Sequence, residues 1–463
     1  MNRKTMKLIS LLCCTVILAL ALAACGNSTN NATNNATNNA TTNKVNTSSQ
    51  EVKEEPIKED PIKEVTITVL VDNTQDAVNG GNAIIDAFQK VHPNIKVEME
   101  TRPGGTEGDN WVKTSLATGD MSDVFFYNSG SLLQALLPEQ NLLDLTNEPF
   151  MDKVMDSFES TVAQNGKVYG VPVGSAMAGG WFYNKKVYAD LSLSVPATWD
   201  ELMTNNEKIK AAGITPVIET FKDSWTSQLI VLADYYHVQA ANSTFAEDYT
   251  ANKAHYTDTP AALRSFEKLA EVFEKGYMNK DYLATTFDAG LKMLAEGTGA
   301  HYPMLSFAVP TIEQNYPELI DNIGFFAQPG DNANDNGLTI WMPGAAYIYK
   351  NSKHPEEAKT FLDFIASPKG MAAMATVSKP TGPYLVEGAV IPDNVANVVK
   401  DMLPYFDANK TAPALEFVSP LKGPNLEQIT VEVGAGITTP NKGADTYDHD
   451  VQKQAKQLGL EGW

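Results

Sequence analysis

Four aromatic side chains lie in or beside segments that could hold a small molecule. A flat aromatic ring packs against the C–H face of a sugar, while polar groups beside it bind the sugar hydroxyls. Each ring could instead be a core residue, and the sequence leaves this open. The four rings are Trp341, Trp225, Trp181 and Phe307. Two further tryptophans, Trp199 and Trp111, are predicted to be core residues of amphipathic helices.

Polar side chains that follow expected strands could supply the hydrogen bonds to such a ligand. Carboxylate, amide, hydroxyl and guanidinium groups can all bind a sugar hydroxyl. Each could equally fix a turn, or cap the following helix in the case of the aspartate near Trp225. The six candidates are Asp223, Asp72, Asn73, Asn128, Ser129 and Arg102.

Other chemistries find less support in the sequence. The chain has 56 acidic residues, so some pair of carboxylates will have the spacing for sugar hydrolysis by chance. Such a pair therefore does not indicate an enzyme. There is no nucleophile elbow, no metal-binding histidine pair and no phosphate loop. The segment 331–337 has the composition of a calcium loop but lacks the glycine at the sixth place and the closing glutamate. We therefore predict a binding protein with no catalytic residue, no metal and no cofactor.

The composition is that of a large folded protein with an acidic surface. The chain has 463 residues, of which 43% are hydrophobic, and a formal net charge of -21. Such a surface repels nucleic acid, so DNA and RNA are not expected partners. The charge says little about a neutral ligand.

The N-terminal end carries the marks of an export signal with a lipid anchor. Arg3, Lys4 and Lys7 precede an apolar stretch that ends in Leu-Ala-Ala-Cys, with the cysteine at position 25. This resembles the bacterial lipobox, so residues 1–24 are expected to be a signal peptide and Cys25 the lipidated residue. Two acyl chains would anchor the protein to the bilayer, on the extracytoplasmic face of a Gram-positive cell membrane.

Residues 25–64 are expected to form a disordered tether. Asn-Ala-Thr triplets and a Glu/Lys/Pro-rich stretch leave almost nothing that could be buried. All three cysteines precede this tether or begin it, so the folded body contains no disulfide.

Strands and helices alternate along the folded body. Residues 65–71, 95–100 and 123–127 are predicted strands, and 82–90 and 110–118 predicted helices. Later helices are expected to begin at Thr198, Pro260 and Pro355. This order predicts an α/β fold with mostly parallel sheets flanked by helices. A body of about 400 residues is too large to fold around a single hydrophobic core. Two lobes with a ligand cleft at the strand ends are therefore expected.

Several stretches in sequence order resemble one known family. These are ATGDMSDV at 117–124, NGKVYGVPV at 165–173, FYNKK at 182–186, PATWDEL at 196–202 and SKHPEEAKTFL at 352–362. They resemble extracellular solute-binding protein family 1 of ABC importers, of the maltodextrin-binding type, from Val65 to the C-terminus. The stretch 297–302 (GTGAHY) departs from the family pattern, so the lining there could differ.

The resemblance implies a two-lobe periplasmic-binding-protein-like fold of type II. Lobe 1 is expected to comprise 65–174 and 300–340, and lobe 2 to comprise 175–299 and 341–463. The implied function is capture of a mono- or oligosaccharide and its delivery, by a monomeric protein, to ABC permease subunits. Two alternatives remain: a sugar sensor for a membrane kinase, and a binding protein for a non-sugar solute.

Overall fold

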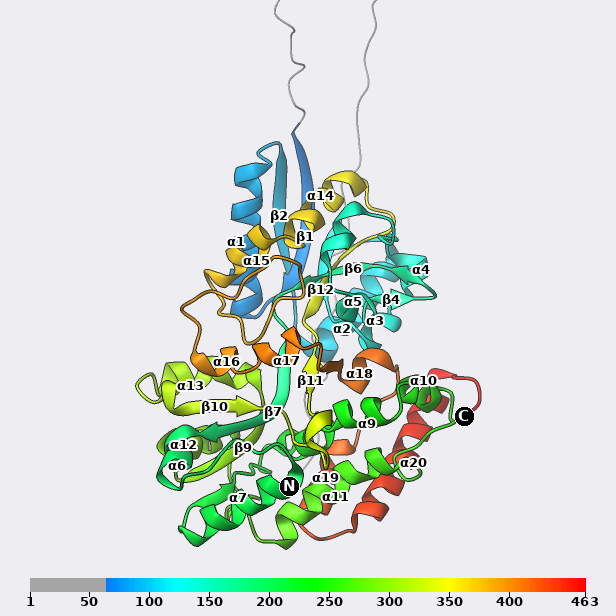
Figure 1. Cartoon of the computed structure of the whole chain (residues 1–463). Helices are drawn as coiled ribbons and strands as arrows, with labels where there is room; N and C mark the ends of the chain where they lie inside the picture. The colour runs from blue at the N-terminus through cyan, green and yellow to red at the C-terminus, as the bar shows by residue number, and fades with distance from the viewer. Residues whose placement is uncertain (1–63) are drawn as a thin grey trace, which may run out of the picture. The chain divides into compact units, whose positions relative to one another are not determined.

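The computed structural model describes residues 64–463, which contain two large β-sheets with flanking helices (Figure 1). A small third sheet pairs β4 (Ala163–Gln164) with β5 (Lys167–Val168). The predicted signal peptide, Cys25 and almost all of the predicted tether lie outside the described residues. No helix within residues 64–463 is long and apolar enough to cross a membrane.

The first sheet has five strands in the order β2-β1-β3-β12-β6. β1 pairs in parallel with β2 and β3, and β12 runs antiparallel to β3 and β6. β1 is rich in β-branched residues and buries its centre on both faces, as the sequence predicts. The strands are β1 (Val65–Asp72), β2 (Ile95–Arg102), β3 (Val124–Tyr127), β6 (Gly170–Val173) and β12 (Gly344–Ile348).

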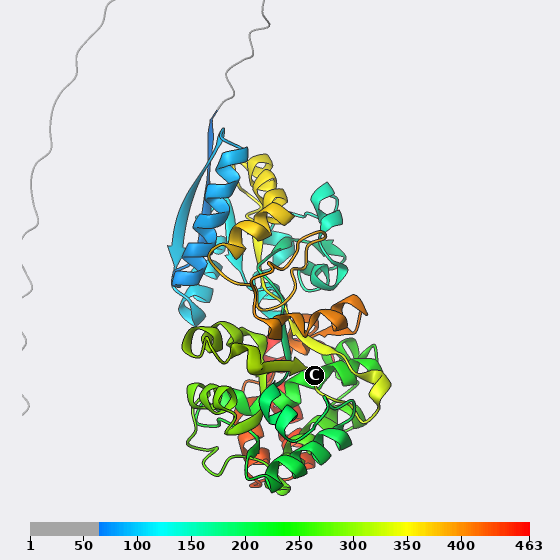
Figure 2. The same ribbon diagram turned by 60° about the vertical axis from the view of Figure 1, so that its left-hand side comes forward.

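Helices from distant parts of the chain cover this first sheet. Helix α1 (Gln75–Val91) packs against β1, β2 and the late helices α14 (Pro355–Ile365) and α15 (Pro368–Ala375) (Figures 1 and 2). Phe88 of α1 meets Phe361 of α14 edge to face, with ring centroids 5.0 Å apart. The chain therefore leaves the first sheet and later returns to it.

The second sheet is built around β7, which runs antiparallel to β9, β10 and β11. Its main path is β13-β11-β7-β9-β8, and β8–β9 and β11–β13 are parallel pairs. Both sheets are thus mixed rather than mostly parallel, within the predicted α/β two-lobe fold. The strands are β7 (Met177–Asn184), β8 (Thr215–Val217), β9 (Gly299–Leu305), β10 (Ile323–Phe326), β11 (Leu338–Trp341) and β13 (Thr411–Pro413).

The predicted helix starts agree with the helices of the second sheet. Thr198 accepts a hydrogen bond from the Glu201 N–H at the start of α7, and Pro260 begins α11. The main helices are α7 (Trp199–Ala211), α8 (Leu229–Ala233), α9 (Tyr235–Ala241), α11 (Pro260–Glu274), α12 (Phe287–Glu296), α19 (Leu426–Gly434) and α20 (Pro440–Leu458).

Strand pairing differs from the expected lobe boundaries, which assigned 300–340 to lobe 1 and 341–463 to lobe 2. The strands within 299–341 pair in the second sheet with β7, and β12 returns the chain to the first sheet. Fully buried strands have the same apolar sequence in either sheet, so the pattern could not reveal which sheet each strand joins. We propose that lobe 1 comprises about 64–173 and 344–395, and lobe 2 about 177–341 and 397–463, because α16 (Asn397–Lys400) packs on β10.

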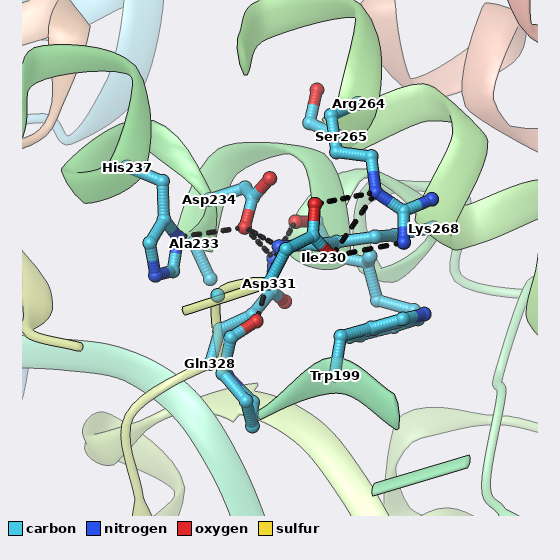
Figure 3. A network of polar contacts seen from close by, with 12 residues as sticks. Trp199, Ile230, Ala233, Asp234, His237, Arg264, Ser265, Lys268, Gln328 and Asp331 are labelled. Carbon is cyan, nitrogen blue, oxygen red and sulfur yellow. Dashed lines mark hydrogen bonds and ion pairs between the residues drawn. The ribbon is translucent and has the colours of Figure 1, made fainter. Parts of the chain in front are cut away.

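A buried ion pair anchors the helices of the second lobe (Figure 3). Asp234 and Lys268 are each 1% exposed, and their carboxylate and ammonium groups are 2.5 Å apart. Asp234 also accepts from Gln328 at 2.7 Å and lies 2.9 Å from His237 Nδ1. Burial alone would raise the pKa of Asp234, but Lys268 and His237 bring it below its usual range. Lys268 also lies 5.2 Å from the ring centroid of Trp199, which is buried as predicted.

Replacing Lys268 by methionine should lower the free energy of unfolding by about 3–5 kcal/mol. The substitution leaves the Asp234 carboxylate buried without its cation, and the desolvation cost then has no compensation. Urea unfolding of the wild type and the variant measures the difference. Lys186→Met, which removes an exposed ion pair with Asp190, is the control and should change stability by less than about 0.5 kcal/mol. Equal effects from the two substitutions would contradict this account.

His301 occupies the segment where the sequence departs from the family pattern. Its side chain is fully buried, with Nδ1 2.9 Å from the Pro216 carbonyl and Nε2 2.6 Å from the Tyr188 hydroxyl. Burial lowers the pKa of His301 to about 3, with the Pro216 carbonyl acting in the opposite direction. The imidazole is therefore neutral in the folded protein and does not line the surface.

The His301→Gln variant should lose less stability than the wild type between pH 7 and pH 5. Below about pH 6.5 the unfolded chain binds a proton at His301 that the folded protein excludes, so stability falls as the pH falls. This one histidine contributes roughly 2 kcal/mol of loss by pH 5, at about 1.4 kcal/mol per pH unit. Denaturant unfolding at both pH values, compared between the two proteins, isolates this contribution. An unchanged pH dependence in the variant would show that His301 is not the group responsible.

Candidate functional site

A cavity of about 410 Å³ lies at the carboxyl ends of β1, β2 and β3. These strands are parallel, so their ends meet at one edge of the sheet, where ligands bind in open α/β sheets. Val173 and Gly344 also line it, at two of the points where the chain crosses between the sheets. The lining residues are Asp72, Ala77, Arg102, Gly105, Asp109, Phe126, Tyr127, Asn128, Leu132, Val173 and Gly344.

Arg102 forms part of the wall of this cavity and is only 6% exposed. Its Nη1 donates to the Pro103 carbonyl at 2.9 Å, and its Nη2 donates to the Phe126 carbonyl at 3.4 Å. Nη1 also lies 3.8 Å from Asp72 Oδ2, and the guanidinium carbon is 5.5 Å from the Tyr127 ring centroid. The charge is thus held against the protein by backbone, carboxylate and ring.

A glycine at position 108 makes this arrangement possible. A Cβ there would lie 1.9 Å from the Pro103 carbonyl oxygen and 2.4 Å from Arg102 Nη1. The first turns of helix α2 (Gly105–Thr118) can therefore pack directly over the guanidinium. The next residue, Asp109, consequently sits at the rim of the cavity.

Tyr127 and Asp109 are two further polar residues of the cavity wall. The Tyr127 hydroxyl is buried and has no hydrogen-bond partner among the described residues, and the same holds for Arg102 Nε. Burial, followed by the nearby Asp109 carboxylate, raises the pKa of Tyr127 well above its usual value. The hydroxyl is therefore protonated at neutral pH.

The predicted polar residues divide into two groups. Asp72, Arg102 and Asn128 line the cavity. Asn73 is exposed but is not part of the lining; its backbone N–H donates to the Arg102 carbonyl. Ser129 is buried, and its hydroxyl donates to the Pro343 carbonyl at 3.0 Å, which ties the β3 loop to a crossing segment. Neither Asn73 nor Ser129 is placed to bind a ligand in this cavity.

A cluster of three half-buried rings lies at the edge of the second sheet, and we call Trp225, Phe287 and Phe307 the aromatic cluster. Their ring centroids are 5.6, 5.8 and 5.8 Å apart. Asp223 Oδ2 accepts from the Phe287 N–H at 2.6 Å, so this carboxylate caps the start of α12 rather than the helix that follows it. Sequence reasoning found Trp225 and Phe307 but missed Phe287, whose position after the helix cap Thr286 was the available signal.

Trp341 ends β11 and is only 7% exposed. Its ring packs on Gly179, where a Cβ would lie 2.5 Å from Cζ3 of the indole. Leu305, which pairs with Gly179, leads directly into Phe307 of the aromatic cluster. Trp341 therefore lies at the same edge of the second sheet as the cluster, and two residues separate it from Gly344 of the cavity.

Trp181 is a core residue, and the prediction of a ligand contact there is wrong for this structure. Its side chain is fully buried, stacks on Phe326 at 6.4 Å and donates to Gln328 at 3.1 Å. Helices cover that face of β7. Trp111, by contrast, was expected in a core but is 38% exposed.

A second cavity, of about 250 Å³, lies between α9, α11 and the loop at 330–335. Its cations are already paired: Lys268 with Asp234, and Arg264 with Asp331 at 3.1 Å (Figure 3). It does not lie at the end of a parallel strand pair. The cavity beside Arg102 is therefore the better candidate. Within residues 64–463 no cluster of histidine, cysteine or carboxylate side chains could hold a metal ion.

Comparison with known proteins places this architecture among binding proteins. The "Multiple sugar-binding protein" of Streptococcus mutans serotype c (strain ATCC 700610 / UA159) is 27% identical over 298 residues, which cover 62% of this chain and 68% of that one. The apo structure of RafE from Streptococcus pneumoniae matches with a TM-score of 0.70 at 23% identity, covering 86% of this chain and all of that one. A sugar transporter of Bacillus licheniformis, solved with stachyose, has a TM-score of 0.61 at 20% identity and covers 84% of this chain and all of that one.

The two structural likenesses concern the fold, since both fall below 25% identity. The family model described as bacterial extracellular solute-binding protein matches residues 72–372, well over half of the sequence. Together with the two-sheet fold and the cavity at the strand ends, this match shows that the chain belongs to the bacterial extracellular solute-binding protein family.

Proposed function

We propose that this chain is the sugar-binding component of an ABC importer, which captures a mono- or oligosaccharide and delivers it to membrane permease subunits. The observation that carries the proposal is the polar cavity at the strand ends of one lobe beside an aromatic edge on the other. A sugar ring needs both surfaces, one for its hydroxyls and one for its C–H face. The binding of sugars by relatives such as the Streptococcus mutans protein supports the same ligand class.

In the proposed complex, the first lobe binds the hydroxyl groups. Asp72 and Asp109 supply acceptors, and Asn128 supplies both a donor and an acceptor. Asp72 Oδ1 accepts from the Thr74 N–H at 2.8 Å, and Oδ2 lies 3.8 Å from Arg102 Nη1, so Asp109 is the carboxylate of the cavity with the fewest protein contacts. Arg102 and the Tyr127 ring shape the wall behind these groups rather than presenting free charge.

The second lobe supplies the apolar surface. Trp225 and Phe307 are half-buried, so a ring face or edge remains for a ligand, whereas Trp341 exposes little. Closure of the two lobes brings the two surfaces onto the same sugar. Short crossing segments favour a hinge motion, and Gly174 in one of them has a φ of 112°, which side-chain-bearing residues rarely adopt.

The proposed setting is the outer face of a Gram-positive cell membrane, with Cys25 lipidated and the segment 25–64 as tether. The protein would act as a monomer and bind without chemical turnover. Cys25→Ala should move the protein from the membrane fraction to the culture medium, because the thiol that carries the lipid is removed. A variant that still fractionates with membranes would contradict the anchor.

A thermal-shift screen against a carbohydrate library tests the central proposal. Ligand binding to the folded protein alone raises the melting temperature, and small-angle scattering with the same ligand should show compaction. Binding with micromolar or tighter affinity and no change in the sugar is the expected result. Hydrolysis of a bound glycoside, or no response to any carbohydrate, would overturn the proposal.

Trp225→Ala should weaken the binding of that sugar by about 1–2 kcal/mol, a loss of roughly five- to thirty-fold in affinity. Trp225 is the largest ring of the aromatic cluster and is half-buried, so part of it remains for a ligand. Isothermal titration calorimetry measures the effect. Trp463→Ala is the matched control, because Trp463 is a half-buried tryptophan whose indole donates to the Thr250 carbonyl, away from the strand ends. Equal affinities of the Trp225 variant and the wild type would remove this ring from the site.

A further inference from the structure

The cavity at the strand ends carries an excess of negative charge. Its charged lining residues are Asp72, Asp109 and Arg102, two acids and one base. Arg102 pairs with Asp72 at 3.8 Å, so one acid is compensated within the wall. Asp109 has no such partner among the ion pairs of residues 64–463. Its negative charge is therefore the uncompensated charge of this cavity.

Arg102 presents little of its guanidinium to the cavity, because the side chain is only 6% exposed. Recognition of a carboxylate by arginine uses two parallel N–H groups that point at the two oxygens. Here both terminal nitrogens donate to the protein, Nη1 to the Pro103 carbonyl and Nη2 to the Phe126 carbonyl. The remaining Nε is buried. The cavity wall therefore contains the positive charge of Arg102, but this charge is almost fully buried and is not exposed to a ligand.

A carboxylate also lies beside the aromatic cluster of the other lobe, because Asp223 Oδ2 accepts from the Phe287 N–H at 2.6 Å. The two surfaces of the proposed site therefore each have a carboxylate, Asp109 in the cavity and Asp223 beside the aromatic cluster.

We propose that this site selects saccharides by charge: it accepts uncharged sugars and excludes sugars that carry a carboxylate, and Asp109 is the residue that sets this selectivity. The inference rests on the proposed sugar-binding function and narrows its ligand class. Asp109 accepts hydrogen bonds from neutral hydroxyls, but it repels a uronate held in the same position. Two like charges about 8 Å apart in a partly buried site repel strongly enough to weaken binding by about tenfold or more.

Matched pairs of neutral and acidic glycans test the proposal with the full-length mature chain. The probes are glucose and glucuronate, galactose and galacturonate, and the oligomers of each, measured by thermal shift and calorimetry at low salt. We expect at least one neutral member to bind and its uronate partner to bind at least about tenfold more weakly. A uronate that binds as tightly as its neutral partner, or more tightly, overturns the charge selection while leaving the sugar-binding function intact. Binding to none of the glycans overturns the proposed function itself.

Asp109→Asn assigns the selectivity to this residue. The amide keeps a similar shape but accepts weaker hydrogen bonds than the carboxylate, so the affinity for the neutral sugar should fall by about fivefold or more. The ratio of the affinity for the neutral sugar to the affinity for its uronate should fall by about threefold or more. Asp86→Asn is the control, because this exposed carboxylate on α1 changes the net charge by the same amount outside the cavity. The role of Asp109 would be overturned if this affinity ratio fell equally in Asp109→Asn and Asp86→Asn, or did not fall in Asp109→Asn.

Discussion

The close crossing of the chain between its two sheets is the constraint on which the rest of the structure depends. β6 passes into β7 through three residues, and β11 passes into β12 through two. Both crossings join strand ends, so the polar edge of one sheet and the aromatic edge of the other meet the same segments. Trp341 and Gly344 belong to different sheets yet are near neighbours in sequence. Ser129, bonded to the Pro343 carbonyl, fixes the β3 loop to this junction.

The buried guanidinium of Arg102 determines the chemistry of the polar edge. Its bonds to two backbone carbonyls and its contact with Asp72 hold the ends of β1, β2 and β3 together. Because the Arg102 guanidinium is almost fully buried, the polar groups offered to a ligand are carboxylates and an amide. Such a surface suits a molecule with many hydroxyls. A glycine is required at position 108, because any side chain there would collide with Nη1 of Arg102.

Strand ends and helix starts could be predicted from the sequence, and side-chain direction could not. The run at 65–71, the cap at Thr198 and the prolines at 260 and 355 each specify local structure by a short-range mechanism. The same logic placed Asp72, Arg102 and Asn128 at the cavity, since residues after parallel strands meet at one edge. The predicted ligand contact of Trp181 was wrong because helices distant in the sequence determine which face of a strand is covered. Asp109 and Tyr127 were missed because one lies in a helix and the other inside a strand.

The second lobe shows why a moving protein needs rigid halves. Asp234, Lys268 and Gln328 join α8, α11 and the segment after β10, and Gln328 also holds the buried indole of Trp181. These buried contacts tie the helices of the lobe to one another, so in the proposed closure the lobe would move as one body. Motion must then be concentrated in the crossing segments, where Gly174 already has a positive φ. A ligand that contacts both edges stabilises the closed arrangement in proportion to the contacts that only closure makes. The affinity of the site is therefore set jointly by the polar edge, the aromatic edge and the cost of bending the crossings between them.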